Sequence, residues 1–303
     1  MYHEFVPVWK DLLTQGLEDD GWPWDWTSMG TSGGASGGRG GRSAVMRAKI
    51  VAKESGIWAA GAGLEAVSTH PDAVEGGRFV IDTRARFADG ARIKKGDVVA
   101  EWKGPARLVL AFERPFLNLA QYVCGVATRT AEMVALVEKA CPRNTPRVVS
   151  TRKTLPGYRD LAVSGVIAGG GKPHRISLGG GILIKENHIA AAGGIARAIE
   201  GVRAVSPHLL KVEIEVRNES ELAQALKARA EVVMLDNFTP DEVKRALKKV
   251  DSAAYRPCIE VSGGINTQTV ASYAIPGVDV ISVGSLTHSV KALDLSMIAE
   301  GVK

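Results

Sequence analysis

Residues 212–236 read VEIEVRNESELAQALKARAEVVMLD and contain one complete strand–helix–strand unit. The two ends, VEIEV and VVMLD, are apolar runs of strand length, whereas the segment between them has the apolar spacing of a helix. Asn218 followed by Glu221 is a pattern that caps the N-terminus of a helix. A helix that joins two short strands in this way is typical of a parallel β-sheet.

The same unit recurs along the second half of the chain. Its strand-like runs are RVVST (147–151), GILIK (181–185), KVEIEV (211–216), VVMLD (232–236), CIEVS (258–262) and VDVISVG (278–284), with HRISL (174–178) a candidate seventh. The segment TPDE (239–242) supplies an N-cap, a proline at the first helical position and a glutamate that completes the cap. Six or seven units favour a parallel β/α barrel, with a doubly wound open sheet as the structural alternative.

The first half of the chain has a different pattern. We expect a helix over residues 5–17, then a flexible loop over 30–41, where seven of twelve residues are glycine. Four apolar runs predict the strands of a mixed sheet: 48–62, 77–87, 97–104 and 106–113. A helix is expected over 115–140. We therefore place the domain boundary at residue 115, with one domain over 1–115 and the second over 116–303.

Composition narrows the class of protein. The chain has 303 residues, 45% of them hydrophobic, a net charge of +5 and a pI of about 9.1. Three cysteines without CxxC spacing indicate reduced thiols, and neither a secretion signal nor an 18-residue apolar run occurs. We expect a cytoplasmic enzyme without membrane contact.

Cations gather where the first predicted strands end. They are Arg152, Lys153, His174, Arg175 and Lys185, and residues 152–185 hold six Lys or Arg against a single acid, Asp160. The active site of a β/α barrel lies at the C-terminal ends of its strands. Arg offers paired donors that suit carboxylates and phosphates, and Lys offers a point charge. This end of the barrel is thus predicted to hold an anion pocket.

The later strands carry the opposite charge. Glu213 and Glu215 project to one face of their strand, and Asp236 closes the next strand. The last two strands end in SGGIN (262–266) and SVGS (282–285), small residues whose backbone N–H groups allow a phosphate to approach. The pattern fits an acidic small molecule together with a sugar phosphate that carries pyrophosphate, with a divalent cation bridging to the carboxylates.

Seven ordered motifs resemble the quinolinate phosphoribosyltransferase family. They are STRKTLPGYR (150–159), GGGKPHRISL (169–178), ILIKENHI (182–189), VEIEV (212–216), MLDNF (234–238), EVSGGI (260–265) and DVISVGSLTHSVKALDLSM (279–297). FERPFLNLAQYVCGVAT (112–128) is similar to the family's helix entry. The resemblance implies an N-terminal α/β sandwich, to which the C-terminal residues are able to return. An incomplete parallel β/α barrel of six to seven strands would follow.

The resemblance also implies roles for single residues. Arg152, His174, Arg175 and Lys185 would hold the two carboxylates of quinolinate, with Arg114 contributed by the neighbouring subunit of a homodimer or of a hexamer built from such dimers. Lys153, Glu215 and Asp236 would hold phosphoribosyl pyrophosphate and Mg²⁺. The 5′-phosphate of phosphoribosyl pyrophosphate would lie against Ser262, Gly263, Gly264, Val283, Gly284 and Ser285. Thr151 would complete the substrate-binding set. The catalytic residues would be Lys153, Lys185, Glu215 and Asp236, and the direct metal ligands Glu215 and Asp236.

Several positions depart from the family pattern. Pro173 stands where Asn is usual, Gly180 where many bacterial members have Asp, and Val163 and Ser164 where Lys-Tyr is common. The Pro-His-Arg form resembles that of a paralogue encoded with molybdate transport genes, which would act on another acidic substrate. The motif ILIKENH keeps Lys185, the lysine that the family uses to bind quinolinate, and therefore favours quinolinate as the substrate.

Two further hypotheses come from other classes. A barrel isomerase or lyase acting on a sugar phosphate would explain the glycine turns but leaves four cations unused. A basic nucleic-acid binder would explain the pI and the tryptophans of GWPWDW (21–26). The neighbouring Asp19, Asp20 and Asp25 argue against it, because they would repel phosphates. We therefore expect no nucleic-acid partner.

Overall fold

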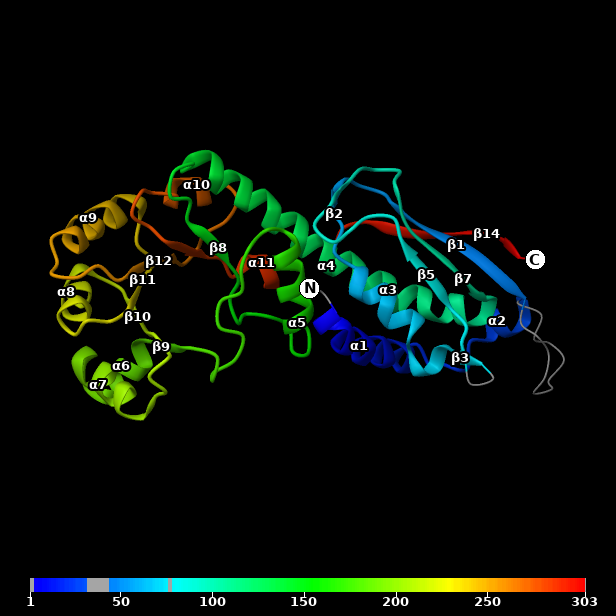
Figure 1. The fold of residues 1–303 in the computed structure, drawn as a ribbon, viewed down its shortest axis with the longest axis horizontal. Helices are drawn as coiled ribbons and strands as arrows, with labels where there is room; N and C mark the ends of the chain where they lie inside the picture. Colours follow the sequence, from blue (N-terminus) through cyan, green and yellow to red (C-terminus); the bar gives the residue numbers. More distant parts are fainter. Residues whose placement is uncertain (1–2, 32–43, 76–77, 303) are drawn as a thin grey trace. The chain divides into compact units, whose positions relative to one another are not determined.

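The computed structural model describes residues 3–31, 44–75 and 78–302 and divides the chain into two compact units (Figure 1). The first, here called the sandwich unit, comprises Met1–Arg129, Leu155–Gly170 and Val290–Lys303. The second, here called the barrel unit, comprises Thr130–Thr154 and Gly171–Ser289. This division and the boundary expected at residue 115 both fall within one long helix, α4 (Ala106–Ala140).

A six-stranded parallel sheet forms the barrel unit. Its strand order is β8-β13-β12-β11-β10-β9, so the first strand in the chain pairs with the last, and no ladder between described residues joins β8 to β9. The sheet is therefore an incomplete barrel, as the sequence predicts. The strands are β8 (Arg147–Val149), β9 (Ile182–Ile184), β10 (Val212–Val216), β11 (Val232–Asp236), β12 (Cys258–Ser262) and β13 (Val280–Ser282).

The candidate seventh strand, residues 174–178, is wrong. This segment is irregular, and only Lys172 forms an isolated bridge to Val149. Pro173 has no N–H to donate to a ladder, and Ile176 and Leu178 are 49% and 71% exposed. The segment thus has no buried face to hold it as a strand.

Helices lie on the outer side of the sheet (Figure 1), and two of them begin at the predicted caps. The side chain of Asn218 accepts a hydrogen bond from the backbone N–H of Glu221, and Thr239 forms a capping box with Glu242. Between β10 and β11, the helix buries Leu222 and Ala225. The helices are α6 (Glu186–Ala192), α7 (Ile195–Val205), α8 (Glu219–Lys227), α9 (Pro240–Asp251), α10 (Val270–Tyr273) and α11 (Ser285–His288).

Strand alternation separates the two faces of the barrel sheet. All five residues of β10 are buried, and side chains two apart project to the same face. Ile214 and Val216 therefore share one face, and Glu213 and Glu215 share the other. The apolar face packs under α7 and α8, so the two glutamates face the inside of the barrel.

The sandwich unit is built on an antiparallel sheet of order β14-β1-β7-β5. The C-terminal strand returns to this sheet, where Met297 pairs with Ile50. The sheet strands are β1 (Val45–Ala52), β5 (Asp82–Ala85), β7 (Val98–Pro105) and β14 (Leu295–Val302). Two short pairs accompany them: β2 (Gly56–Ile57) with β6 (Arg92–Ile93), and β3 (Val74–Glu75) with β4 (Arg78–Phe79). The other elements are η1 (His3–Phe5), α1 (Val6–Asp19), α2 (Trp26–Thr31), α3 (Gly61–Ser68), η2 (Pro71–Ala73) and α5 (Arg159–Ala168).

Three predictions about the first half need correction. The run 77–87 is not one strand but contains two, β4 and β5, which belong to different sheets. Residues 106–113 are not a strand but the first turns of α4, because Val109, Phe112 and Phe116 recur at helical spacing and are fully buried. The run 48–62 is a strand only to Ala52, followed by the short β2 and the start of α3. Part of the glycine-rich segment 30–41, residues 32–41, lies outside the described residues.

Aromatic side chains fill the core of the sandwich unit. Trp9 stacks on Phe116 with ring centroids 5.8 Å apart, and Trp102 meets the same ring edge-on at 5.0 Å. Gly16 lets α1 approach α4, because a Cβ there would lie 2.9 Å from the Cβ of Pro115. Among the helices of the described residues, none is long and apolar enough to cross a membrane.

Candidate active site

A cavity of about 290 Å³ lies at the C-terminal ends of the barrel strands. Its polar lining residues come from the C-terminal halves of the strands, from the segments that follow β8 and β9, and from the loop between α5 and β9. The lining cations are Arg152, Lys153, His174, Arg175 and Lys185, the acids are Glu215, Asp236 and Glu260, and the hydroxyl groups belong to Thr151, Ser262 and Ser282. The fold thus brings together all five cations that the sequence singles out.

Arg152 and Arg175 form the most cationic part of this cavity. The positive charge of Arg152 adds to the effect of burial in lowering the pKa of Arg175. One guanidinium nitrogen of Arg175 donates to the backbone carbonyl of Gly181 at 3.0 Å, which fixes the group in place. The buried Nε of Arg152 has no hydrogen-bond partner. Two neighbouring cations with an unused donor are well suited to a multivalent anion.

Lys185 and Glu215 connect the cationic and acidic sides. The Lys185 ammonium lies 2.5 Å from a carboxylate oxygen of Glu215, which is 8% exposed. Burial raises the pKa of Asp236, and the negative charge of Glu215 raises it further, while Lys185 and Lys153 oppose the shift. These four side chains therefore act on one another electrostatically within a single cavity.

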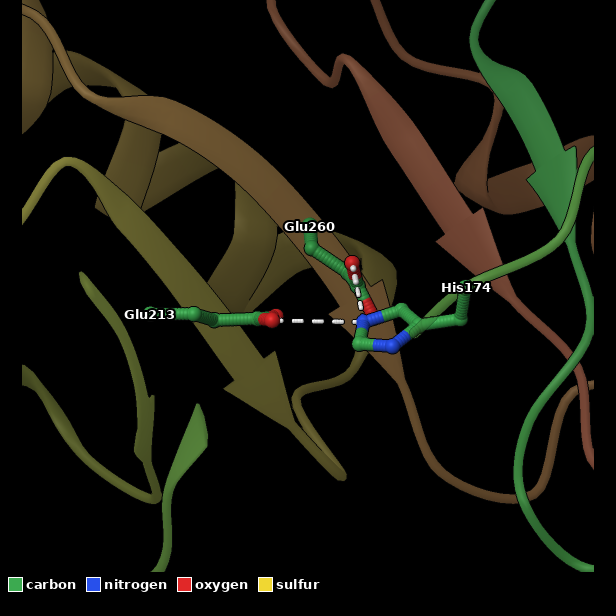
Figure 2. A group of neighbouring side chains, drawn as sticks. All are labelled: His174, Glu213 and Glu260. Atoms are coloured by element: carbon green, nitrogen blue, oxygen red, sulfur yellow. Dashed lines mark ion pairs between the residues drawn. The ribbon is translucent and has the colours of Figure 1, made fainter. Parts of the chain in front are cut away.

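His174 forms a second buried cluster, which the sequence does not predict (Figure 2). Its Nε2 lies 3.2 Å from a carboxylate oxygen of Glu213 and 3.5 Å from one of Glu260. Burial alone would lower the pKa of His174, but contacts with the two carboxylates raise it to about 10. Burial raises the pKa of Glu213, while His174 opposes the shift. The arrangement of two carboxylates around one ring nitrogen thus favours the protonated form of His174.

Glu260 and Ser282 are the polar lining residues that the sequence reasoning missed. Glu260 stands two residues before Ser262 in β12, and Ser282 ends β13. The signal was available: the alternation that pairs Glu213 with Glu215 also places Glu260 on the same face as Ser262. In an apolar run such as CIEVS, the sequence alone does not distinguish a glutamate that faces a ligand site from one that faces solvent.

The glycine turns after β12 and β13 lie at the edge of the cavity. Of the six residues predicted to hold a phosphate, Ser262 lines the cavity itself, and the other five lie within three residues of Ser262 or Ser282 in the chain. Gly263 has a φ of +99°, and a Cβ on it would lie 2.2 Å from Oδ1 of Asn237. A Cβ on Gly284 would lie 3.3 Å from the side chain of Lys153. The turn after β12 therefore needs glycine at position 263, whereas a Cβ at position 284 would require only a small shift of neighbouring side chains.

The remaining predicted positions lie elsewhere. Arg114 is exposed on α4 in the sandwich unit and is not among the described lining residues. Val163 and Ser164 are buried in α5 of the same unit. A second cavity of about 390 Å³ lies between β9 and helices α6 and α7, with no acid in its lining. Of these two cavities, only the smaller one has both cationic and acidic residues in its lining.

Comparisons with known proteins cover nearly the whole chain. Residues 126–298 match the model for the quinolinate phosphoribosyl transferase C-terminal domain, and residues 25–124 match that for the N-terminal domain. A Bacillus subtilis protein named probable nicotinate-nucleotide pyrophosphorylase [carboxylating] is 40% identical over 254 residues, covering 82% of each chain. A human nicotinate-nucleotide pyrophosphorylase [carboxylating] is 38% identical over 210 residues, covering 69% of this chain and 70% of its own. The structure of the nicotinate-nucleotide pyrophosphorylase from Francisella tularensis superimposes with a TM-score of 0.84 at 32% identity, covering 97% of both chains.

Proposed function

The chain belongs to the quinolinate phosphoribosyltransferase family, and we propose that the cavity of about 290 Å³ is its active site. The reaction is that of a carboxylating nicotinate-nucleotide pyrophosphorylase in NAD biosynthesis. Quinolinate and phosphoribosyl pyrophosphate give nicotinate mononucleotide, pyrophosphate and CO₂. The observation that supports this site most strongly is the convergence of five cations beside buried carboxylates in one cavity.

Quinolinate occupies the cationic side in this proposal. Arg152, Arg175 and Lys185 are donors for its two carboxylates, and His174 contributes the remaining positive charge. Arg175 is already held by Gly181, so part of its ordering cost is met before the ligand binds. A dianion held at several points has one orientation, and orientation accounts for much of the rate enhancement in reactions between two bound substrates.

Phosphoribosyl pyrophosphate occupies the acidic and glycine side. Lys153, Glu215 and Asp236 lie toward its ribose and pyrophosphate, and the turns after β12 and β13 receive its 5′-phosphate. Thr151 and Ser262 add hydroxyl groups to the lining. The backbone N–H groups of the glycine turns are the donors a phosphate requires.

Mg²⁺ fits the acidic residues of the cavity. Glu215 and Asp236 supply the oxygen ligands that this ion prefers, and the pKa of Asp236 is raised partly by the charge of Glu215. A divalent cation would offset that repulsion between the two carboxylates. When bound, it supplies charge neutralisation for the pyrophosphate group.

The mechanism follows from the placement of these charges. As pyrophosphate departs, positive charge develops at the anomeric carbon, and Glu215 and Asp236 stabilise it. The pyridine nitrogen then attacks that carbon from the orientation set by Arg152 and Arg175. The ring nitrogen becomes quaternary and draws electrons from the ring, so the adjacent carboxylate leaves as CO₂. The electron pair of the broken C–C bond stays on the ring carbon, which takes a proton from solvent to give nicotinate mononucleotide. Lys185 stays near both substrates throughout, through its pair with Glu215.

A homodimer is part of the proposal. Arg114 is exposed on α4 and is followed by Pro115, which fixes the backbone beside it. In the dimer, Arg114 of one subunit would reach the quinolinate site of the other and add a further cation. Its role can be tested by mixing two inactive variants, as described below.

Product analysis tests the proposed reaction. The purified protein is incubated with phosphoribosyl pyrophosphate, Mg²⁺ and either quinolinate or nicotinate. We expect nicotinate mononucleotide and CO₂ in equal amounts from quinolinate and no reaction with nicotinate. If neither pyridine reacts while phosphoribosyl pyrophosphate still binds, the phosphate site stands, and the departure at Pro173 becomes evidence for another acidic substrate.

A further inference from the structure

The inside of the barrel holds two buried acids to which the proposed reaction assigns no role. Glu213 of β10 and Glu260 of β12 are 7% and 2% exposed, and His174 reaches them from the loop between α5 and β9. Barrel interiors are normally filled by branched apolar side chains. Two buried carboxylates are therefore costly, and their retention calls for a role.

Each carboxylate leaves one oxygen unused. Oε1 of Glu213 and Oε1 of Glu260 are both buried without a hydrogen-bond partner, while the other oxygen of each faces Nε2 of His174. Among the described residues, His174 is the only Lys, Arg or His with a nitrogen within 4 Å of either carboxylate. Lys185 pairs with Glu215 instead. The two acids thus act together on a single ring nitrogen.

The second ring nitrogen of His174 has neither of the two carboxylates as a partner. His174 lines the cavity, and Figure 2 shows its other ring nitrogen, Nδ1, turned away from both carboxylates. A neutral ring with its proton on Nε2 would present a lone pair at Nδ1 and repel a substrate carboxylate. A doubly protonated ring presents an N–H donor there. The charge state of His174 therefore decides whether this wall attracts or repels an acid.

We propose that Glu213 and Glu260 are positioning residues that orient the ring of His174 and keep it an imidazolium, so that Nδ1–H donates to a carboxylate of quinolinate. The inference rests on the proposed function, because it assigns the anion at Nδ1 to that substrate. It also explains why Glu260 lines a cavity for a dianion: its charge is offset by His174 rather than presented to the ligand.

A double-mutant cycle tests this coupling. The variants are Glu260→Gln, His174→Gln and the two combined, and the measurement is the Kd of quinolinate by calorimetry. A lost charge-assisted contact should raise the Kd about 10-fold to 100-fold in Glu260→Gln. If Glu260 acts through His174, the double variant binds no worse than His174→Gln alone. Binding of phosphoribosyl pyrophosphate should stay within about 2-fold of wild type, because its proposed contacts do not include His174.

Glu219→Gln is the matched control. Glu219 is another glutamate of the barrel unit, paired with Arg245 and Lys249 on the surface, and it lines neither cavity. It should leave the Kd of quinolinate unchanged. If Glu260→Gln does not fold, Glu213→Gln replaces it in the test. This variant removes the other carboxylate beside His174 and should raise the Kd of quinolinate to a similar extent.

Nitrogen NMR of the histidine side chains gives a readout that is independent of any substrate. At pH 8, the free wild-type protein should show His174 with both ring nitrogens protonated, and Glu260→Gln should show a neutral ring. An unchanged Kd in Glu260→Gln, additive losses in the double variant, or a neutral ring in wild type would each overturn the inference. So would a transition metal that copurifies with the wild type and is lost in Glu260→Gln, because the trio would then be a metal site.

The two proposals fail in different ways. If wild-type protein binds another pyridine acid but not quinolinate, the assigned substrate is wrong, while the NMR signal of His174 still reports the cluster. If quinolinate reacts and the ring is neutral, the reaction stands and only the inference about Glu213 and Glu260 falls.

Discussion

Lys185 connects the two halves of the proposed site, since its ammonium pairs with Glu215 beside the cations for quinolinate. We predict that Lys185→Ala lowers kcat/KM about 10³-fold, which corresponds to about 4 kcal/mol of transition-state stabilisation. The free energy of unfolding should fall by only about 1–2 kcal/mol, because the lysine side chain is 46% exposed and already well solvated.

Steady-state rates and urea unfolding of the same preparation separate these effects. Lys244→Ala, which removes a surface lysine paired with Asp241, is the control and should change neither quantity appreciably. A wild-type rate in Lys185→Ala would remove this lysine from the site.

The charge on His174 makes a second prediction, for stability against pH. Its folded pKa of about 10 lies above its ordinary value of 6.5, so the folded state holds this proton more tightly than the unfolded state. The resulting stabilisation is complete below pH 6.5 and is lost as the pH rises through 10. Between pH 8 and 9.5, wild-type protein should lose up to about 1.4 kcal/mol per pH unit in excess of His174→Gln. Equal slopes in urea unfolding would contradict the assignment of this pKa.

At the residue scale, the sequence located the cations well and the acids less completely. Arg152, Lys153 and Lys185 follow apolar runs directly, so the barrel pattern alone placed them at one end of the sheet. Glu260 lies inside an apolar run, and a period-2 pattern does not say which face of a strand meets a ligand. Its closeness to His174 depends on the path of an irregular loop, which has no sequence signature.

At the scale of elements, periodicity was reliable for long segments and ambiguous for short ones. The capping patterns at Asn218 and Thr239 predicted where α8 and α9 begin, and the structure confirms both. The run 106–113 is predicted as a strand because eight residues are too few to distinguish the helical period of 3.6 from the strand period of 2. Only the burial of Phe112 together with Phe116 settles it as helix.

The turn after β12 gives a prediction at the same scale. Gly263→Ala should raise the KM for phosphoribosyl pyrophosphate more than 10-fold, because a Cβ there meets Asn237 at 2.2 Å in a backbone with φ of +99°. Gly264→Ala is the matched control: its φ is +60°, but a Cβ would have no atom within 4 Å. Its cost is the backbone strain alone, about 1–2 kcal/mol. Equal effects in both variants would show that packing against Asn237 does not shape the phosphate site.

For the whole molecule, the repeat of strand and helix predicted the barrel, because each unit must bury its apolar face against the next. The pattern does not show where the chain leaves a domain and returns. Leu155–Gly170 and the C-terminal strand β14 belong to the sandwich unit, and both are separated from it by barrel segments. Local periodicity carries no information on such long-range pairing.

The proposed dimer makes a prediction at this scale. Arg114→Ala and Lys185→Ala should each be nearly inactive alone. When the two proteins are mixed and allowed to exchange subunits, a mixed dimer has one site with both native residues, provided that Arg114 acts on the partner. Random exchange should restore about one quarter of the wild-type activity. No recovery, in a mixture that light scattering shows to be dimeric, would place Arg114 in the site of its own subunit or outside both.

The central claim is that quinolinate binds in the cavity of about 290 Å³ at the strand ends, and a crystal structure of the quinolinate complex tests it most directly. We predict that the ligand's carboxylates lie within hydrogen-bond distance of Arg152, Arg175 and Lys185, with one oxygen facing Nδ1 of His174. Quinolinate bound instead between β9 and helices α6 and α7, or contacting none of these cations, would contradict the account.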